Sequence, residues 1–354
     1  MDKSYQKLEI VSRGKELIDI SKTGKKRDWN GKKEIATKIE ESYLRCYKKT
    51  GNETYAKKSE KIHMCATYLM FLENMQTEEK KLFNANFCRQ RLCPMCKWRL
   101  ALKNCNQLTM VLNEVDKTEY GLIFVTFTIK NCIGEKLENA LKEMRKGLSK
   151  MYRYKIIKKC VKGAFMGIEI THNLNPKSKD YDTYHPHIHC VWVVPKEYAT
   201  KGSDLYITQA ELTNLWKRAC KLNYTPVVDI RKADMRSILE VAKYTTKDSD
   251  IIVPNDEEMT DKTLMILDSA LKGKRLIEYS GMLKEIHKRL KLDDPEDGDL
   301  INIDGSEDDK ILDNFVEVIY YYNFGYKAYY EDTRQKVSED NKKRILGETK
   351  ESNF

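Results

Sequence analysis

The sequence predicts an α+β protein in which an antiparallel sheet carries helices packed on one face. Four segments rich in β-branched and aromatic residues indicate strands. Between them, apolar residues recur every three or four positions, as in amphipathic helices. Because the predicted strands and helices do not alternate strictly, an α+β arrangement is favoured over a parallel α/β sheet. At 354 residues the chain is long enough to bury a sizeable core in one to three domains.

The elements follow in chain order. The run LIFVTFTIK predicts the first strand, and the apolar spacing after residue 135 predicts the first long helix. An Asn-, Pro-, Lys- and Asp-rich loop separates the second strand from the third, and Asp234 can cap a later helix. The expected strands are 122–130, 164–171, 187–194 and 225–230, and the expected helices are 135–154, 208–222, 234–244, 256–272 and 280–291.

Two histidines one residue apart mark a candidate metal site. Side chains alternate between the faces of a strand, so His187 and His189 project from the same face. Glu169 falls on the partly polar face of the preceding strand and could be a third, oxygen ligand; the alternative is a glutamate that faces solvent. A mixed nitrogen and oxygen site with open positions suits Mg²⁺ or Mn²⁺ and metal-assisted phosphodiester chemistry.

The helix expected from Asp234 supplies a candidate nucleophile. Tyr244 could attack a metal-polarised phosphate, forming a phosphotyrosyl ester and releasing a 3′-hydroxyl. Glu240, one turn earlier, is placed to act as general base for the phenol or for a water that later resolves the ester. Lys243 or Lys247 could stabilise the extra negative charge of the transition state. Such pairs are often ordinary surface neighbours, but the preceding two-histidine strand favours the catalytic interpretation.

A cysteine cluster forms a second candidate site. Cys88, Cys93 and Cys96 have the spacing C-x₄-C-x₂-C, and Cys65 is the preferred fourth ligand for a structural Zn²⁺, ahead of Cys105 and His63. The alternative is a set of buried cysteines without metal. A zinc ion here would brace a basic surface that could bind nucleic acid, made of Arg89, Arg91, Lys97, Arg99 and Lys103.

Charge is unevenly distributed along the chain. Residues 1–110 hold 24 Lys and Arg against 13 Asp and Glu, whereas residues 291–354 hold 9 against 17. With a formal net charge of +10, this basic front favours a polyanionic partner, nucleic acid first among them. No apolar run approaches the roughly 20 residues of a membrane span, and the amino terminus does not resemble a signal peptide. A cytoplasmic protein with reduced or metal-bound cysteines and no membrane contact is therefore expected.

Composition divides the chain into five expected parts. They are a basic, mobile or loosely helical arm (1–61), a Cys-rich zinc-binding module (62–110), a catalytic domain (111–291), a solvated acidic linker (292–309) and a C-terminal segment in a region expected to be helical (310–354). In the last part, the aromatic run 320–326 could stack on bases. Packing against the catalytic domain is the favoured alternative.

The sequence resembles the plasmid rolling-circle replication initiators, or Rep proteins, of the HUH endonuclease superfamily on small Gram-positive bacterial plasmids. The resemblance covers roughly residues 62–330 and rests on the ordered motifs FVTFT (124–128), HPHIH (185–189) and EVAKYTTK (240–247). Further likeness lies in FCRQRLCPMC (87–96) and GKRLI (273–277).

The resemblance implies an HUH endonuclease-like fold that nicks one strand at a plasmid origin. Tyr244 would form the 5′-phosphotyrosine link and free a 3′ end for priming, and Glu240 would activate water to end the round. His185 stands where many members of this family carry Asn, which leaves the metal-binding histidine pair open. We expect the pair to be His187 and His189, with His185 beside them or in contact with DNA.

The expected partner is origin DNA, single-stranded or as a hairpin. The resemblance adds a host helicase, and self-association is a further possibility. Two other functions stay open: an HUH transposase or mobilisation relaxase with the same chemistry, and a non-catalytic zinc-containing DNA-binding protein. The last would not need the hydroxyl of Tyr244.

Overall fold

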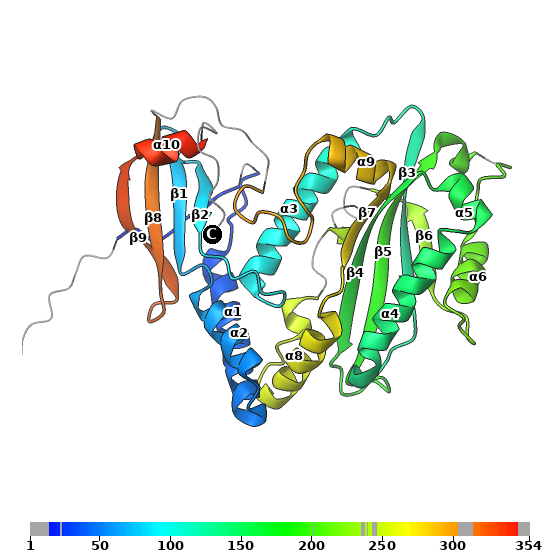
Figure 1. Ribbon diagram of the computed structural model, residues 1–354, viewed down its shortest axis with the longest axis horizontal. Helices are drawn as coiled ribbons and strands as arrows, with labels where there is room; N and C mark the ends of the chain where they lie inside the picture. Colours follow the sequence, from blue (N-terminus) through cyan, green and yellow to red (C-terminus); the bar gives the residue numbers. More distant parts are fainter. Residues whose placement is uncertain are drawn as a thin grey trace, which may run out of the picture.

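The computed structural model describes residues 14–21, 23–200, 202–234, 238, 240–242, 246–303 and 314–345, and these fold around two antiparallel sheets (Figure 1). The larger sheet has the order β6-β3-β5-β4-β7 and the smaller one β2-β1-β8-β9. The strands of the larger sheet are β3 (Tyr120–Thr128), β4 (Gly163–Asn173), β5 (Thr183–Pro195), β6 (Val228–Lys232) and β7 (Ile277–Gly281). Those of the smaller sheet are β1 (Tyr68–Asn74), β2 (Lys80–Ala85), β8 (Phe315–Asn323) and β9 (Ala328–Lys336).

All four predicted strands are present in the larger sheet, in the predicted antiparallel arrangement. Their alternating pattern separates a mainly apolar face, which includes Val125, Ile188 and Trp192, from a face on which only one half is apolar. The central strand β5 pairs with β3 and β4, so residues from three strands meet around its amino-terminal half. The short edge strand β7 was not predicted; its residues alternate, but five positions are too few for a clear signal, and its last two fall within the helix predicted at 280–291.

Helices cover both faces of this sheet, so the expectation that they pack on one face is wrong. The apolar face lies against α4 (Gly134–Met151), whose buried residues follow the predicted helical spacing, and α6 (Gln209–Ala219), which begins with a Thr208–Glu211 capping box. The other face packs its apolar half against α3 (Pro94–Asn113), α9 (Met282–Arg289) and the segment around Val241. Among the described helices, none is long and apolar enough to cross a membrane.

The smaller sheet is built from two segments far apart in the sequence, residues 68–85 and residues 315–336. Its central pair brings β1 beside β8, some 250 positions later in the sequence. Most of the described part of the expected amino-terminal arm is folded, because α1 (Trp29–Thr50) packs into the core through Trp29, Ile39 and Tyr43, and α2 (Glu53–Met64) packs through Ile62. The expected helical C-terminal region is wrong: residues 315–336 form a β-hairpin, followed by the short α10 (Glu339–Ile345).

The acidic segment 292–303 is packed against the protein, so the prediction of a solvated linker is wrong for these residues. Arg99 on α3 donates hydrogen bonds to the carbonyl oxygens of Leu300 and Ile301 at 2.8 Å. Lys103 donates to the carbonyl oxygen of Asp294 at 2.7 Å. The segment lies between α3 and the turn before β7, which opens beneath α8 (Glu257–Leu271) (Figure 1). Residues 304–309 lie outside the described part of the chain.

Candidate active site and metal centres

Two histidines and a glutamate meet on the partly polar face of the larger sheet. Strand β5 carries His187 and His189, and the antiparallel register places Glu169 of β4 opposite His187. Nε2 of His189 lies 3.0 Å from Oε2 of Glu169, and one potential ligand atom of each residue lies within 4.8 Å of the other two. Ligand atoms around one Mg²⁺ or Mn²⁺ ion are about 3–4 Å apart, so small side-chain rotations bring all three to a common ion.

The surroundings of the two imidazoles differ. Nδ1 of His189 is hydrogen-bonded to Oγ1 of Thr126 at 3.0 Å, which turns Nε2 toward Glu169. Nδ1 of His187 is buried and has no hydrogen-bond partner among the described residues. A buried, unpaired imidazole nitrogen is costly unless another group binds it, and a metal ion is such a group. Thr126 was not among the site residues predicted from the sequence. Its position in the FVTFT strand, opposite His189, places it on this face.

The ionisation states of these side chains suit metal binding. Burial lowers the pKa of His187 to about 4, and the neighbouring His185 and His189 act in the same direction. Burial alone would raise the pKa of Glu169, but the hydrogen bond to His189 and the charge of Lys247 outweigh it and hold that pKa at about 2. At neutral pH the site therefore offers an uncharged imidazole and a carboxylate, the forms that bind metal.

The EVAKYTTK motif crosses the same face of the sheet. Val241 and Ala242 are buried against it, and the backbone oxygen of Val241 approaches Gly167 so closely that an added Cβ would lie only 2.5 Å away. Gly167 lies directly opposite His189 in the sheet and two residues before Glu169, so the motif contacts the sheet beside the candidate metal ligands. Glu240 is exposed. Lys243 and Tyr244 lie outside the described residues, and their predicted roles rest on the sequence.

The end of the motif is tied to the histidine site and to α3. Nζ of Lys247 lies 3.2 Å from Oε1 of Glu169. Nζ of Lys97 donates to the backbone oxygen of Thr246 at 3.0 Å and pairs with Asp248 at 2.8 Å. Lys97 follows directly after Cys96, so the cysteine cluster and the residues just after Tyr244 are joined through one buried side chain.

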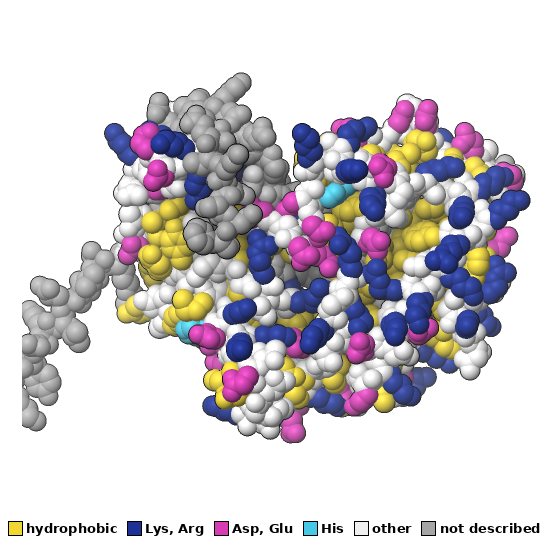
Figure 2. All heavy atoms as spheres, viewed as in Figure 1, with side chains coloured by type: hydrophobic (Ala, Val, Ile, Leu, Met, Phe, Trp, Pro, Cys, Tyr) yellow, Lys and Arg dark blue, Asp and Glu magenta, His cyan; other side chains and the backbone are white. Residues whose placement is uncertain are grey.

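The predicted basic surface on α3 is wrong for three of its five residues. Lys97, Arg99 and Lys103 are buried, because their charges are used to hold residues 246–248 and the acidic segment 292–303. Arg89 and Arg91 are exposed. Lys and Arg side chains are instead spread over the half of the molecule that contains the larger sheet (Figure 2). On α4 and the following α5 (Lys155–Cys160), exposed basic residues include Lys142, Lys146, Lys150, Lys155, Lys158 and Lys159.

The four cysteines of the second candidate site converge. Sγ of Cys65 lies 3.6 Å from Sγ of Cys93 and of Cys96, and Sγ of Cys88 lies 3.7 Å from Sγ of Cys96. A tetrahedron with Zn–S bonds of about 2.3 Å has edges of about 3.8 Å, and a disulfide bond is only about 2.05 Å long. The spacing therefore matches four ligands of one tetrahedral ion. Backbone N–H groups of residues 88, 89 and 90 point at three of the sulfurs.

The alternatives for the fourth cysteine ligand lie elsewhere in the structure. His63 is hydrogen-bonded to Glu40 at 2.9 Å and stacks on Phe324. Cys105 does not belong to the four-cysteine group among the described residues. Contacts with Cys88 raise the pKa of the Cys65 thiol, whereas contacts with Cys65 lower the pKa of Cys88.

Comparison with known proteins identifies similar sequences. A family model described as a replication protein, Rep_1, matches residues 79–330. A "Protein rep" of Bacillus amyloliquefaciens is 41% identical over 338 residues, which cover 88% of this chain and 96% of that protein. Proteins of the same name from Lentilactobacillus hilgardii and Streptococcus pneumoniae serotype 2 are 34% and 32% identical, covering 89% and 83% of this chain and 98% and 89% of their own lengths. No solved structure matches the chain significantly.

Proposed function

This chain belongs to the Rep_1 family of replication proteins, and we propose that it initiates rolling-circle replication of a plasmid by nicking one strand of the origin DNA. The observation that carries the proposal is the position of the described residues of the EVAKYTTK motif: the backbone oxygen of Val241 lies against Gly167, which pairs with His189, and Lys247 pairs with Glu169. A central strand with paired histidines in an antiparallel sheet also supports an HUH endonuclease-like fold. Origin DNA, single-stranded or as a hairpin, is the substrate.

The two histidines and Glu169 fit one Mg²⁺ or Mn²⁺ ion, which would supply Lewis-acid polarisation of the scissile phosphate. The hydroxyl oxygen of Tyr244 attacks phosphorus, its proton passes to a base, and the bond from phosphorus to O3′ breaks. The products are a 5′-phosphotyrosine ester and a free 3′-hydroxyl, which primes synthesis. The charge balance is unchanged, because the leaving oxygen takes up a proton.

Glu240 and the lysines complete the reaction. Glu240 is exposed and lies four positions before Tyr244 in the sequence; it would accept a proton from the phenol or from the water that later hydrolyses the ester. The ammonium of Lys247, paired with Glu169 at 3.2 Å, lies where it can offset negative charge that develops on the phosphate. Lys243 is a second candidate for that role. His185, next to His187, contacts the DNA or orients its neighbour.

The cysteine cluster fits a structural Zn²⁺ held by Cys65, Cys88, Cys93 and Cys96. A zinc ion with four thiolates carries a net charge of −2, and the buried Lys33 lies beside it, donating to the carbonyl oxygens of residues 62, 63 and 65. This site would hold the start of α3, and with it Lys97. It has no part in the chemical step.

The test is a covalent-adduct assay. Wild-type protein is incubated with Mn²⁺ and single-stranded DNA verified to carry the cognate origin, then trimmed with nuclease and run on a denaturing gel. We expect a slower-migrating adduct that a chelator abolishes and that Tyr244→Phe lacks, although this variant still binds DNA. Tyr206→Phe, at an exposed tyrosine outside the site, is the matched control.

The other outcomes are informative. An adduct in Tyr244→Phe would keep the reaction but move the nucleophile to another tyrosine. No adduct in any protein, with intact DNA binding, would favour a non-catalytic DNA-binding protein. In His187→Ala, adduct formation and its dependence on metal should fall together, and Glu240→Ala should form the adduct but release it slowly.

A further inference from the structure

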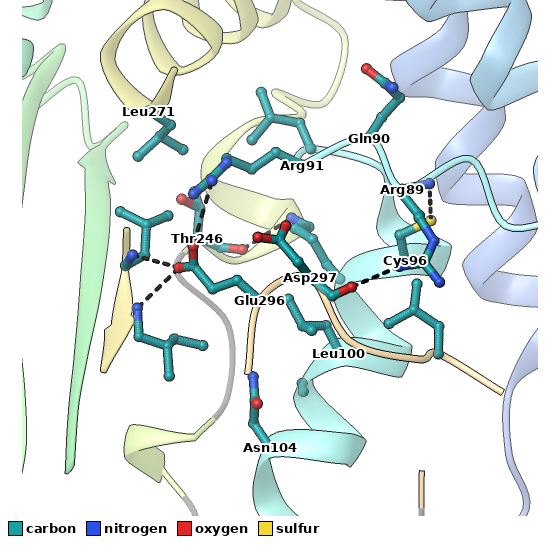
Figure 3. Close-up of a pocket in the computed structure, with 16 residues that line it drawn as sticks. Arg89, Gln90, Arg91, Cys96, Leu100, Asn104, Thr246, Leu271, Glu296 and Asp297 are labelled. Carbon is teal, nitrogen blue, oxygen red and sulfur yellow. Dashed lines mark hydrogen bonds and ion pairs between the residues drawn. The ribbon is translucent and has the colours of Figure 1, made fainter. Parts of the chain in front are cut away.

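A cavity lies beside the candidate active site, between α3, the acidic segment 292–303 and the turn before β7 (Figure 3). Its volume is about 130 Å³. A cavity of about 150 Å³ can bind a benzene ring, so this one has room for a single flat ring system. No residue assigned to the nicking reaction or to metal binding lines it, apart from Cys96 at one edge.

Two buried polar side chains that line this cavity lack partners. The amide of Asn104 is fully buried, and neither its Nδ2 nor its Oδ1 has a hydrogen-bond partner among the described residues. The hydroxyl of Thr246 is buried as well and is likewise unpaired within the described part of the chain. A buried polar group without a hydrogen-bond partner destabilises a fold. The amide of Asn104 therefore has one N–H donor group and one oxygen acceptor without partners, which points to a bound molecule with both an acceptor and a donor on one edge.

The rest of the lining suits a flat, uncharged ring attached to a phosphate. The walls are mainly apolar, formed by Leu92, Leu100, Ala101, Leu271, Leu276 and Ile277. Arg89 and Arg91 also line the cavity and are exposed to solvent. Arg89 donates to the carbonyl oxygens of Asp297 and Gly298, and Arg91 lies 3.7 Å from a carboxylate oxygen of Glu296, so a phosphate would share these two cations with groups of the protein. The carboxylate of Glu296 is already bound by the backbone N–H groups of Leu276 and Ile277, which reduces its repulsion of an anion.

The cavity and the candidate metal site are adjacent along the backbone. Thr246 lines the cavity, and the next residue, Lys247, pairs with Glu169 of the metal site. The side chain of Lys247 thus connects the two sites, so a DNA strand with one phosphate at the metal site can bring the base of that nucleotide or of a neighbour in the strand to Thr246.

We propose that this cavity binds one unpaired nucleobase of the DNA strand, close to the phosphate that is cut. The open donor and acceptor of Asn104 match adenine best, because an asparagine amide can form a bidentate pair with an adenine edge. Thr246 provides an additional hydrogen bond. The inference rests on the proposed nicking function and adds a site that reads the sequence of the substrate.

The experiment measures binding of oligonucleotides that carry the nick site, with one nucleotide at a time made abasic, to wild type and to Asn104→Leu. Leucine fills a similar volume without polar atoms, so the variant should be at least as stable as wild type in a thermal melt. We expect one position near the cut where loss of the base weakens wild-type binding about tenfold but leaves binding to Asn104→Leu nearly unchanged. Asn113→Leu, exposed at the end of α3, is the control and should behave as wild type.

Every alternative result but the last overturns the inference. If every abasic position affects wild type and Asn104→Leu equally, no base enters the cavity and water fills it. If deoxyadenosine monophosphate binds in an Asn104-dependent way while no DNA position does, the cavity is a site for a free nucleotide. Adduct formation is measured in the same samples: an adduct without an Asn104-dependent position rejects the base site alone. A base dependence without an adduct rejects nicking but keeps the base site.

Discussion

Replacing Gly167 by alanine tests whether the contact between β4 and the EVAKYTTK motif sets the rate of nicking. The new Cβ would lie 2.5 Å from the backbone oxygen of Val241. A carbon–oxygen contact relaxes at about 3.3 Å, so the motif must move by roughly 0.8 Å, because no side-chain rotation relieves a clash between two backbones. A displacement of about 1 Å at reacting groups can slow a reaction about 100-fold. Overpacking of this kind also costs about 1–3 kcal/mol of stability.

We therefore expect Gly167→Ala to form the phosphotyrosyl adduct about 10- to 100-fold more slowly in single-turnover experiments, with DNA affinity within about threefold of wild type. Gly121→Ala is the matched control, since Gly121 lies in the same sheet and its added Cβ would only reach a methyl group of Val194 at 3.9 Å. It should react at the wild-type rate. A wild-type rate in Gly167→Ala as well would refute the idea that this contact positions the nucleophile.

Three further predictions follow from the packing around the site. Cys93→Ser should lose its bound zinc and unfold at a lower denaturant concentration; full zinc occupancy by metal analysis would contradict the ligand assignment. Lys97→Met should slow adduct formation about tenfold with little change in DNA affinity, because residues 246–248 lose a buried anchor; an equal loss of binding would indicate general misfolding. Hydrogen bonds from Arg45 and neighbouring groups outweigh burial and lower the pKa of Asp261, so its contribution to stability is present above about pH 4 and is lost as the pH falls. Asp261→Asn should be less stable than wild type at pH 7, and the difference should shrink as the pH falls below about 4; a difference in denaturant melts that does not change with pH would refute the assignment.

Local pattern sufficed for most of the larger sheet. The four predicted strands and the helices predicted at 135–154, 208–222, 256–272 and 280–291 lie within a few positions of their predicted bounds, because alternation and helical spacing report which side of each element is buried. The helix predicted at 234–244 falls largely outside the described residues. The same parity brought Glu169, His187 and His189 to one face. It also placed Thr126 there, although its contact with His189 needed the register of β3 on β5.

The errors concern contacts between segments far apart in the sequence. The region that contains the hairpin 315–336 was expected to be helical. The strand that stabilises this hairpin, β1, lies about 250 positions earlier, so the pairing could not be seen in the local sequence. Lys97, Arg99 and Lys103 were expected on the surface because charged residues are seldom fully buried. Their partners, residues 246–248 and the acidic segment 292–303, were not visible as neighbours in the sequence.

The sequence by itself determined the chemical groups of this protein and their local order: two histidines on one strand face, a tyrosine motif after them, and a cysteine set with zinc-ligand spacing. Such features depend on residue type and on the short repeats of strands and helices. Only the tertiary structure decided that Cys65 lies with the other three cysteines, that Lys97 joins α3 to residues 246–248, and that Asn104 lines a cavity next to them. These contacts depend on how distant segments pack, and packing is set by the shape and burial of the whole chain rather than by neighbours in sequence.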